Sequence, residues 1–276
     1  GFTDAGGAVS QMNDYLVGRL ESREVVRFST DELLDYRARR PTMFFDRDHL
    51  TDYVPARLSL HLIRDELGTP FLLLDGFEPD FQWERFAAAV LGLVERFEVT
   101  DTTWVHAIPM PTPHTRPLGV TVSGSRPELI EAHSLWRPRT QVPTNVLHLI
   151  EHRLQQTGHP TVGFVVLVPH YLSDTEFPAT AVKALEMISA ATGLIFPTDH
   201  LRAENRDFLA KVEDQVHGNE ELQRLIETLE RRHDSYIEEN PLPSPLVDES
   251  GRLPTADSLA AELEKFLAAQ RDDDPR

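Results

Sequence analysis

The chain has 276 residues, 40% of them hydrophobic and 26% charged, so it is long enough to bury a sizeable core. It has no cysteine, which excludes disulfides and thiolate metal sites and favours a cytoplasmic location. The formal net charge of −18 argues against nucleic acid and membrane surfaces as main partners, because both are negatively charged.

The first seven residues are typical of a turn between a strand and a helix. Because the chain starts at Gly1 without a methionine, we expect an N-terminal segment with a first strand to precede it. Backbone amides at a helix N-terminus attract anions, so Asp4, Gly6 and Gly7 are candidate ligand-binding residues. Alternatively, the glycines serve only the tight turn and Asp4 caps the helix.

Apolar residues recur at helical spacing from Val9 to Leu20, which predicts a helix after this turn. Ser29 and Glu32 match a capping box, which predicts a short helix toward Tyr36. Strands are predicted at residues 24–28, 42–45, 58–62 and 71–74. The third of these alternates leucine with polar residues, as expected of a strand with one solvent-exposed face.

Three arginines, Arg37, Arg39 and Arg40, lie within four positions of an otherwise acidic chain. Guanidinium groups suit bidentate contacts with carboxylate or phosphate, so these residues are candidates for an anion or subunit contact. Salt bridges within or between subunits are the simpler interpretation. Further along, Glu78 and Asp80 precede an amphipathic helix predicted at residues 81–97. Asp80 suits its N-cap, which leaves Glu78 as a candidate site residue.

A strand predicted at residues 102–108 runs into a loop that is stiff because it contains four prolines. Within this loop, His114 could act as a general acid or base and Arg116 could hold an anionic group. The alternative is that both residues hydrogen-bond a turn or form an oligomer contact. Strand 120–122 and a helix at residues 143–156, with Pro143 in its first turn, are expected next.

Residues 162–168 are apolar at every position, which is typical of a central strand with helices on both faces. His170 follows at the carboxyl end of this strand, where open α/β sheets bind ligands, unless it simply ends the strand. The helix at 143–156 carries the pattern His148-x-x-Glu151-His152, which formally matches a zinc motif. No third ligand is evident, so we predict no metal and no cofactor.

Strands and helices alternate through the first two thirds of the chain, which indicates a parallel or mixed sheet in a layered α/β fold. A helix at 178–192 ends at Gly193, and two charged helices follow within residues 199–239. The predicted organisation is an α/β domain (1–197), a charged helical domain (198–240), a proline-rich linker (241–254), and a C-terminal helix with an acidic tail (255–276).

Five segments occur in a family-specific order: Gly1-x-x-Asp4-Ala5-Gly6-Gly7, Asp35-Tyr36-Arg37-Ala38-Arg39-Arg40-Pro41, Glu78-Pro79-Asp80 with Trp83, Pro113-His114-Thr115-Arg116-Pro117, and Val168-Pro169-His170-Tyr171. With them, most of residues 1–240 resembles the bacterial branch of the PAC2 (proteasome assembly chaperone 2-like) family. The resemblance implies a three-layer α/β/α sandwich of the nucleoside-phosphorylase-like type with a smaller C-terminal helical part. It also implies homo-oligomers, with a trimer as the first expectation.

The primary functional hypothesis is a non-enzymatic, oligomeric protein-binding or assembly-chaperone-like factor. The terminal residues Asp274-Pro275-Arg276 depart from the hydrophobic-Tyr-any tripeptide of proteasome activators. The alternative is a nucleoside- or phosphate-binding protein, or a phosphorylase- or hydrolase-like enzyme, so activity is left open. Its cleft would lie at the carboxyl edge of the sheet and contain Asp4, Glu78, His114, Arg116 and His170.

Overall fold

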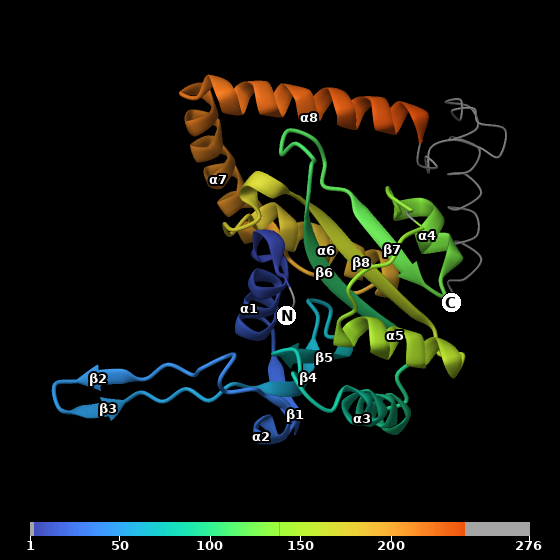
Figure 1. Ribbon diagram of the computed structural model, residues 1–276. Coiled ribbons are helices and arrows are strands. Elements are labelled where there is room, and N and C mark those ends of the chain that lie inside the picture. Colours follow the sequence, from blue (N-terminus) through green and yellow to red (C-terminus); the bar gives the residue numbers. More distant parts are fainter. Residues whose placement is uncertain (1–2, 138, 241–276) are drawn as a thin grey trace, which may run out of the picture. The chain divides into compact units, whose positions relative to one another are not determined.

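The computed structural model describes residues 3–137 and 139–240, which belong to one compact unit, residues 1–240 (Figure 1). The predicted linker at 241–254 and the final helix and tail at 255–276 lie outside the described residues. Within the described part, no helix is long and apolar enough to cross a membrane.

A mixed sheet of three strands forms the centre of the unit, in the order β6-β8-β7. β6 and β8 run parallel, from Thr102 opposite Thr161 to Met110 opposite Pro169, and β7 is antiparallel to β8. The prediction of a central, doubly covered strand at 162–168 is confirmed, because β8 is buried along almost its whole length. The strand bounds are β6 (Thr102–Met110), β7 (Val120–Gly124) and β8 (Thr161–Pro169).

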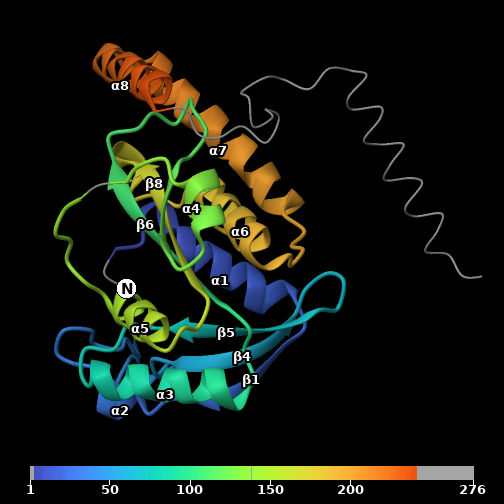
Figure 2. The same ribbon diagram turned by 90° about the vertical axis from the view of Figure 1, so that its right-hand side faces the viewer.

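A second, antiparallel sheet has the order β1-β4-β5 and lies between α1 on one side and α3 on the other (Figure 2). The solvent face predicted for the middle strand is wrong at Ser59, which is only 2% exposed. The Ser59 hydroxyl donates to the Glu24 carboxylate at 2.8 Å, which satisfies it at this position. The strand bounds are β1 (Ser22–Arg27), β4 (Leu58–Arg64) and β5 (Pro70–Gly76).

A two-stranded hairpin of β2 and β3 extends away from the rest of the described chain (Figure 1). The sequence predicted a strand at 42–45 but not its partner. The observed strands are β2 (Phe44–Asp46) and β3 (His49–Thr51), with Phe45 opposite Leu50.

Helices cover the sheets through two apolar cores. In the larger core, α1 and α6 pack against β6 and β8, which contribute Val105 and Phe164 among others. The smaller one joins α3 and α5 with Leu58 of β4. The helix bounds are α1 (Ala8–Arg19), α3 (Trp83–Arg96), α4 (Pro127–His133), α5 (Val146–Gln156) and α6 (Pro178–Thr192), with 3-10 turns η1 (Ala5–Gly7) and η2 (His170–Leu172).

Two helix boundaries differ from the sequence prediction. α2 (Thr30–Leu33) stops well before Tyr36, because the Leu33 carbonyl accepts the Asp80 amide at 2.7 Å and the chain turns extended; the Ser29 side chain makes no capping bond. α5 starts at Val146 rather than near Pro143, because the Asn145 side chain caps it. α4 was not predicted at all.

The two charged helices expected within 199–239 are confirmed as α7 (Asp199–His217) and α8 (Glu220–Glu239). α7 packs on α6, and the Phe208 ring stacks on Phe177 with centroids 5.2 Å apart. The mixed α/β class is therefore confirmed. The three-layer sandwich of the nucleoside-phosphorylase type stays a prediction, as does a domain boundary near residue 197.

Candidate functional site

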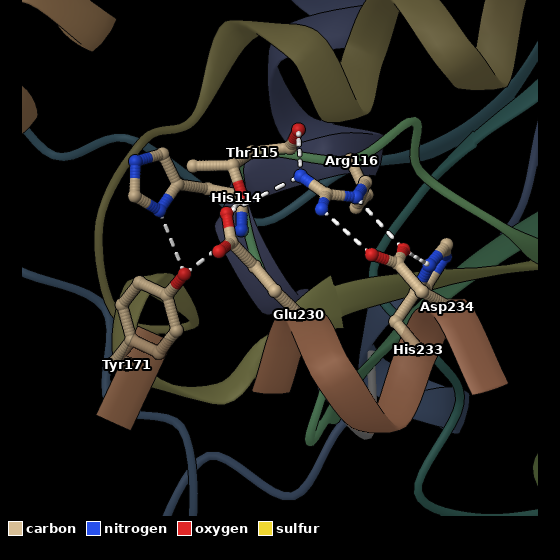
Figure 3. Close-up of polar contacts among 7 residues, drawn as sticks. All are labelled: His114, Thr115, Arg116, Tyr171, Glu230, His233 and Asp234. Carbon is tan, nitrogen blue, oxygen red and sulfur yellow. Dashed lines mark hydrogen bonds and ion pairs between the residues drawn. The ribbon is translucent and has the colours of Figure 1, made fainter. Parts of the chain in front are cut away.

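The loop after β6 meets the end of β8 in a polar cluster that α8 closes (Figure 3). The Tyr171 hydroxyl accepts the His114 amide at 2.8 Å and lies 2.7 Å from the His114 Nδ1 atom. Because the hydroxyl already accepts from the amide, its own proton is best donated to Nδ1. His114 then carries its ring proton on Nε2.

Burial sets the protonation of both side chains. It lowers the pKa of His114, although Glu213 and Glu230 oppose this shift, and it raises the pKa of Tyr171. His114 is therefore neutral and Tyr171 protonated near pH 7. A neutral histidine tied to a protonated tyrosine is a rigid pair with one free ring N–H.

Arg116 is held by α8 through a bidentate ion pair. Its Nε and Nη2 atoms donate to the two Asp234 carboxylate oxygens at 2.9 and 2.7 Å, and Nη1 lies 3.2 Å from the Glu230 carboxylate. The Arg116 hydrogen bonds lower the pKa of Asp234 to about 2. A guanidinium engaged in this way has its charge compensated internally, so the cluster joins α8 to the loop rather than presenting a free cation.

The N-terminal turn places its candidate residues inside the fold. The Asp4 carboxylate accepts the amides of Val9 and Ser10, at 2.8 and 2.9 Å, in the first turn of α1. These are the amides that an anion would otherwise bind. Gly6 is buried with φ of 68°, and a Cβ there would lie 2.8 Å from Thr180. Gly7 also has a positive φ, of 61°.

Glu78 and Arg39 also have internal contacts. One Glu78 carboxylate oxygen accepts the Val146 amide at 2.9 Å, at the start of α5. Arg39 pairs with Asp80 and lies over the Phe77 ring, 5.3 Å from its centroid. Arg37 and Arg40 are exposed on the surface.

The structure divides the five residues of the expected cleft into two groups. Asp4 and Glu78 line a cavity of about 580 Å³ between the two sheets. His114 and Arg116 belong to the cluster under α8, and His170 is exposed beside Tyr171, with ring centroids 5.4 Å apart. The five predicted cleft residues therefore do not line one common cavity. No group of three or more potential metal ligands occurs within the described ranges.

Polar residues outside the predicted site also line the cavity. His106 lies inside β6 and is 8% exposed, and burial lowers its pKa to about 4. Asp75 accepts a hydrogen bond from Asn13, and burial raises the Asp75 pKa. The buried Asn13 Oδ1 and Thr103 Oγ1 atoms have no partner among the described residues. For His106, the sequence signal was a histidine placed within an apolar strand.

This fold and site define a mixed α/β protein in which the polar cluster of His114, Arg116 and Tyr171 is held by internal contacts. The PAC2 family model matches residues 1–216. The chain therefore belongs to the PAC2 family.

Two solved structures share much of the sequence. A Mycobacterium tuberculosis protein of unknown function is 42% identical, with 86% of this chain and 83% of that chain covered and a TM-score of 0.81. A protein of unknown function from Corynebacterium glutamicum is 35% identical, with coverage of 87% and 89% and a TM-score of 0.83. A search of curated proteins gave no match.

A more distant structure carries a functional description. It is a proteasome-assembly chaperone homologue from Mycobacterium tuberculosis, 21% identical, with coverage of 82% and 96% and a TM-score of 0.74. At this identity the likeness shows a shared fold.

Proposed function

We propose that this protein is an oligomeric, protein-binding factor of the assembly-chaperone type, acting in the cytoplasm and without a catalytic site. Membership of the PAC2 family and the fold shared with a proteasome-assembly chaperone homologue support this proposal. The family resemblance favours a homotrimer as the working assembly.

The observation that carries the proposal is the apolar surface of the β2–β3 hairpin. Phe44, Phe45 and Leu50 are 62%, 64% and 58% exposed, and Phe45 lies opposite Leu50 across the two strands. Met43, Tyr53 and Val54, which flank the hairpin, are also exposed. Because neighbouring residues of a strand point to opposite faces, Phe45 and Leu50 share one face of the hairpin and Phe44 lies on the other. Exposed apolar side chains gathered on one short hairpin in this way are typical of a protein-binding segment.

Burial of this surface would release substantial free energy. Each large apolar side chain that moves from water into an interface contributes about 1–2 kcal/mol at these exposures. Two aromatic rings and a leucine on one short hairpin can therefore supply a central part of a protein interface. A second copy of the chain is the partner that is always present, so we assign the hairpin first to self-association.

The alternative of a nucleoside or phosphate enzyme is not favoured. Its arginine, Arg116, is paired with Asp234 and Glu230, and Asp4 occupies the helix amides that would bind a phosphate. A phosphate would have to displace these contacts and pay for the carboxylates left unpaired.

The test is the oligomeric state of the double variant Phe44→Ser/Phe45→Ser, measured by sedimentation velocity. We expect the unaltered protein to sediment as an oligomer and the double variant as a monomer. Phe97→Ser is the matched control, because Phe97 is an exposed aromatic residue at the C-cap of α3, outside the hairpin. The proposal fails if the unaltered protein is a monomer at tens of micromolar, or if the control and the hairpin variant dissociate equally.

A further inference from the structure

A second group of exposed apolar side chains lies at the end of β4 that is far from the hairpin. Leu67, in the turn between β4 and β5, is 73% exposed, and Ile195, between α6 and α7, is 45% exposed. The two segments are adjacent, because the Glu66 amide donates to the Ile195 carbonyl at 3.2 Å. Leu67 and Ile195 together are called the aliphatic patch below.

A buried carboxylate fixes this patch in place. Asp65 is 6% exposed, and its two oxygens accept the Leu67 amide at 3.0 Å and the Ile195 amide at 2.9 Å. The hydrogen bond from the Ile195 amide is the main cause of the lowered Asp65 pKa, so this carboxylate is ionised at neutral pH. Leu194 and Phe196, on either side of Ile195, are buried. The fold therefore holds both segments of the patch firmly while their aliphatic side chains stay in solvent.

The hairpin and the aliphatic patch lie at opposite ends of β4. The hairpin leads into this strand at Leu58, and the turn that contains Leu67 follows its last residue, Arg64. The seven extended residues of β4 separate the two places by about 20 Å. The hairpin also extends away from the rest of the described chain (Figure 1). A contact between the hairpin and the patch therefore needs two copies of the chain.

The charges around the two places are complementary. Residues 36–57, which include the hairpin, carry five arginines and three aspartates in a chain whose net charge is −18. Beside the patch, the carboxylates of Glu66 and Asp199 are exposed. Two cations, Arg19 and Arg64, share this region, but with the buried aspartate the carboxylates outnumber them. Such complementarity orients docking, whereas the burial of apolar side chains supplies most of the free energy.

We propose that the hairpin of one copy docks on the aliphatic patch of the next copy, with the face of Phe45 and Leu50 against the patch. This inference rests on the proposed self-association of the hairpin and names the surface that receives it. An interface between two different surfaces of one chain is heterologous, so each copy gives one hairpin and receives another. A closed ring of three copies would use every hairpin and every patch.

The experiment combines two variants that lack different halves of the interface. Phe44→Ser/Phe45→Ser removes the hairpin surface, and Leu67→Ser/Ile195→Ser removes the patch. All four side chains are exposed, so we expect both variants to fold, which circular dichroism checks. Val142→Ser is the matched control, because Val142 is an exposed aliphatic residue in the loop before α5.

Sedimentation velocity then reports which halves can combine. We expect each double variant alone to be a monomer, and their equimolar mixture to contain a dimer, because one intact hairpin meets one intact patch. The unaltered protein and Val142→Ser should form the larger ring.

Cross-linking tests the same contact independently, since the chain has no cysteine of its own. After subunit exchange, a short bismaleimide should join Leu50→Cys copies to Leu67→Cys copies. Either variant alone should give little cross-linked product, because its cysteine faces no second cysteine.

The outcomes separate this proposal from the self-association on which it rests. A Leu67→Ser/Ile195→Ser protein that keeps the size of the unaltered oligomer, while the hairpin variant is a monomer, would overturn the docking site alone. Cross-linking of Leu50→Cys with itself would do the same, because it would show that hairpins pack against each other. A monomeric unaltered protein would overturn the self-association, and the docking site with it.

Discussion

His106 shows how burial changes the chemistry of a single side chain. It is 8% exposed on β6, and burial, followed by the proximity of His148, lowers its pKa to about 4. The ordinary value is near 6.5, so the folded protein keeps His106 neutral where the unfolded chain would bind a proton. The stability of the fold therefore depends on pH through this residue.

The sign of this dependence follows from proton counting. Between pH 6.5 and pH 4 the unfolded state binds more protons than the folded state, so stability falls as the pH falls through this window. The full effect is about 3 kcal/mol, from roughly 2.5 pKa units. We expect a His106→Gln variant to show a shallower loss of unfolding free energy between pH 6.5 and 4, measured by urea denaturation.

Some slope should remain in this variant, because burial also lowers the pKa of His148. His217→Gln is the control, since His217 is exposed at the end of α7. An unchanged slope in His106→Gln would show that His106 does not stay neutral in the folded protein.

The sequence identified some of these residues and missed others. Prolines and a strand end marked the loop of His114 and Arg116 from local pattern alone. Their partners are Tyr171, Glu230 and Asp234, which lie 57 to 118 residues further along the chain. No local sequence pattern predicts pairs at such separations. His106 was missed because a histidine inside an apolar strand has no spacing signature.

At the scale of elements, α8 depends on contacts with the loop after β6. Its apolar stripe is narrow, with Ile226 and Leu229 as its buried residues within the described chain. The ion pairs of Arg116 with Asp234 and Glu230 supplement this small apolar contact. When a charged helix buries only a short apolar stripe, its local stability depends on such specific contacts.

We expect Arg116→Ala to loosen α8 without unfolding the sheets. The substitution removes the bidentate contact that ties α8 to the loop, so amide exchange in the second half of α8 should accelerate about fivefold. Hydrogen exchange with mass spectrometry measures this directly. Arg224→Ala is the control, because Arg224 pairs with Glu220 one turn away on the same helix, on an exposed surface.

Two results would contradict this prediction. Equal exchange in α8 of Arg116→Ala and of the unaltered protein would show that apolar packing alone holds the helix. A general acceleration in β6 and β8 would show instead that the loop supports the whole unit.

At the scale of the whole molecule, the net charge of −18 opposes assembly of identical copies. Each added copy brings the same negative charge, whereas the exposed hairpin residues favour association. The two effects differ in their response to salt, because screening weakens only the electrostatic repulsion.

We therefore expect self-association to strengthen with ionic strength. Raising NaCl from about 20 mM to about 300 mM shortens the Debye length from roughly 20 Å to roughly 6 Å. The dissociation constant from sedimentation equilibrium should fall over this range. A rise would mean that attractive ion pairs between copies, rather than apolar contacts, hold the assembly together.

The amino-acid sequence by itself determined the mixed α/β class, the central strand at 162–168, the two charged helices and the PAC2 resemblance. These depend on local periodicity, turn residues and short motifs, which can be recognised in the sequence without the structure. Tertiary structure decided the end of α2 at Leu33, the burial of Ser59, the ion pairs of Arg116 and the cavity beside β6. Each of these depends on contacts between residues that are far apart in the sequence. Such contacts form only when packing brings the residues together, so the sequence pattern does not reveal them.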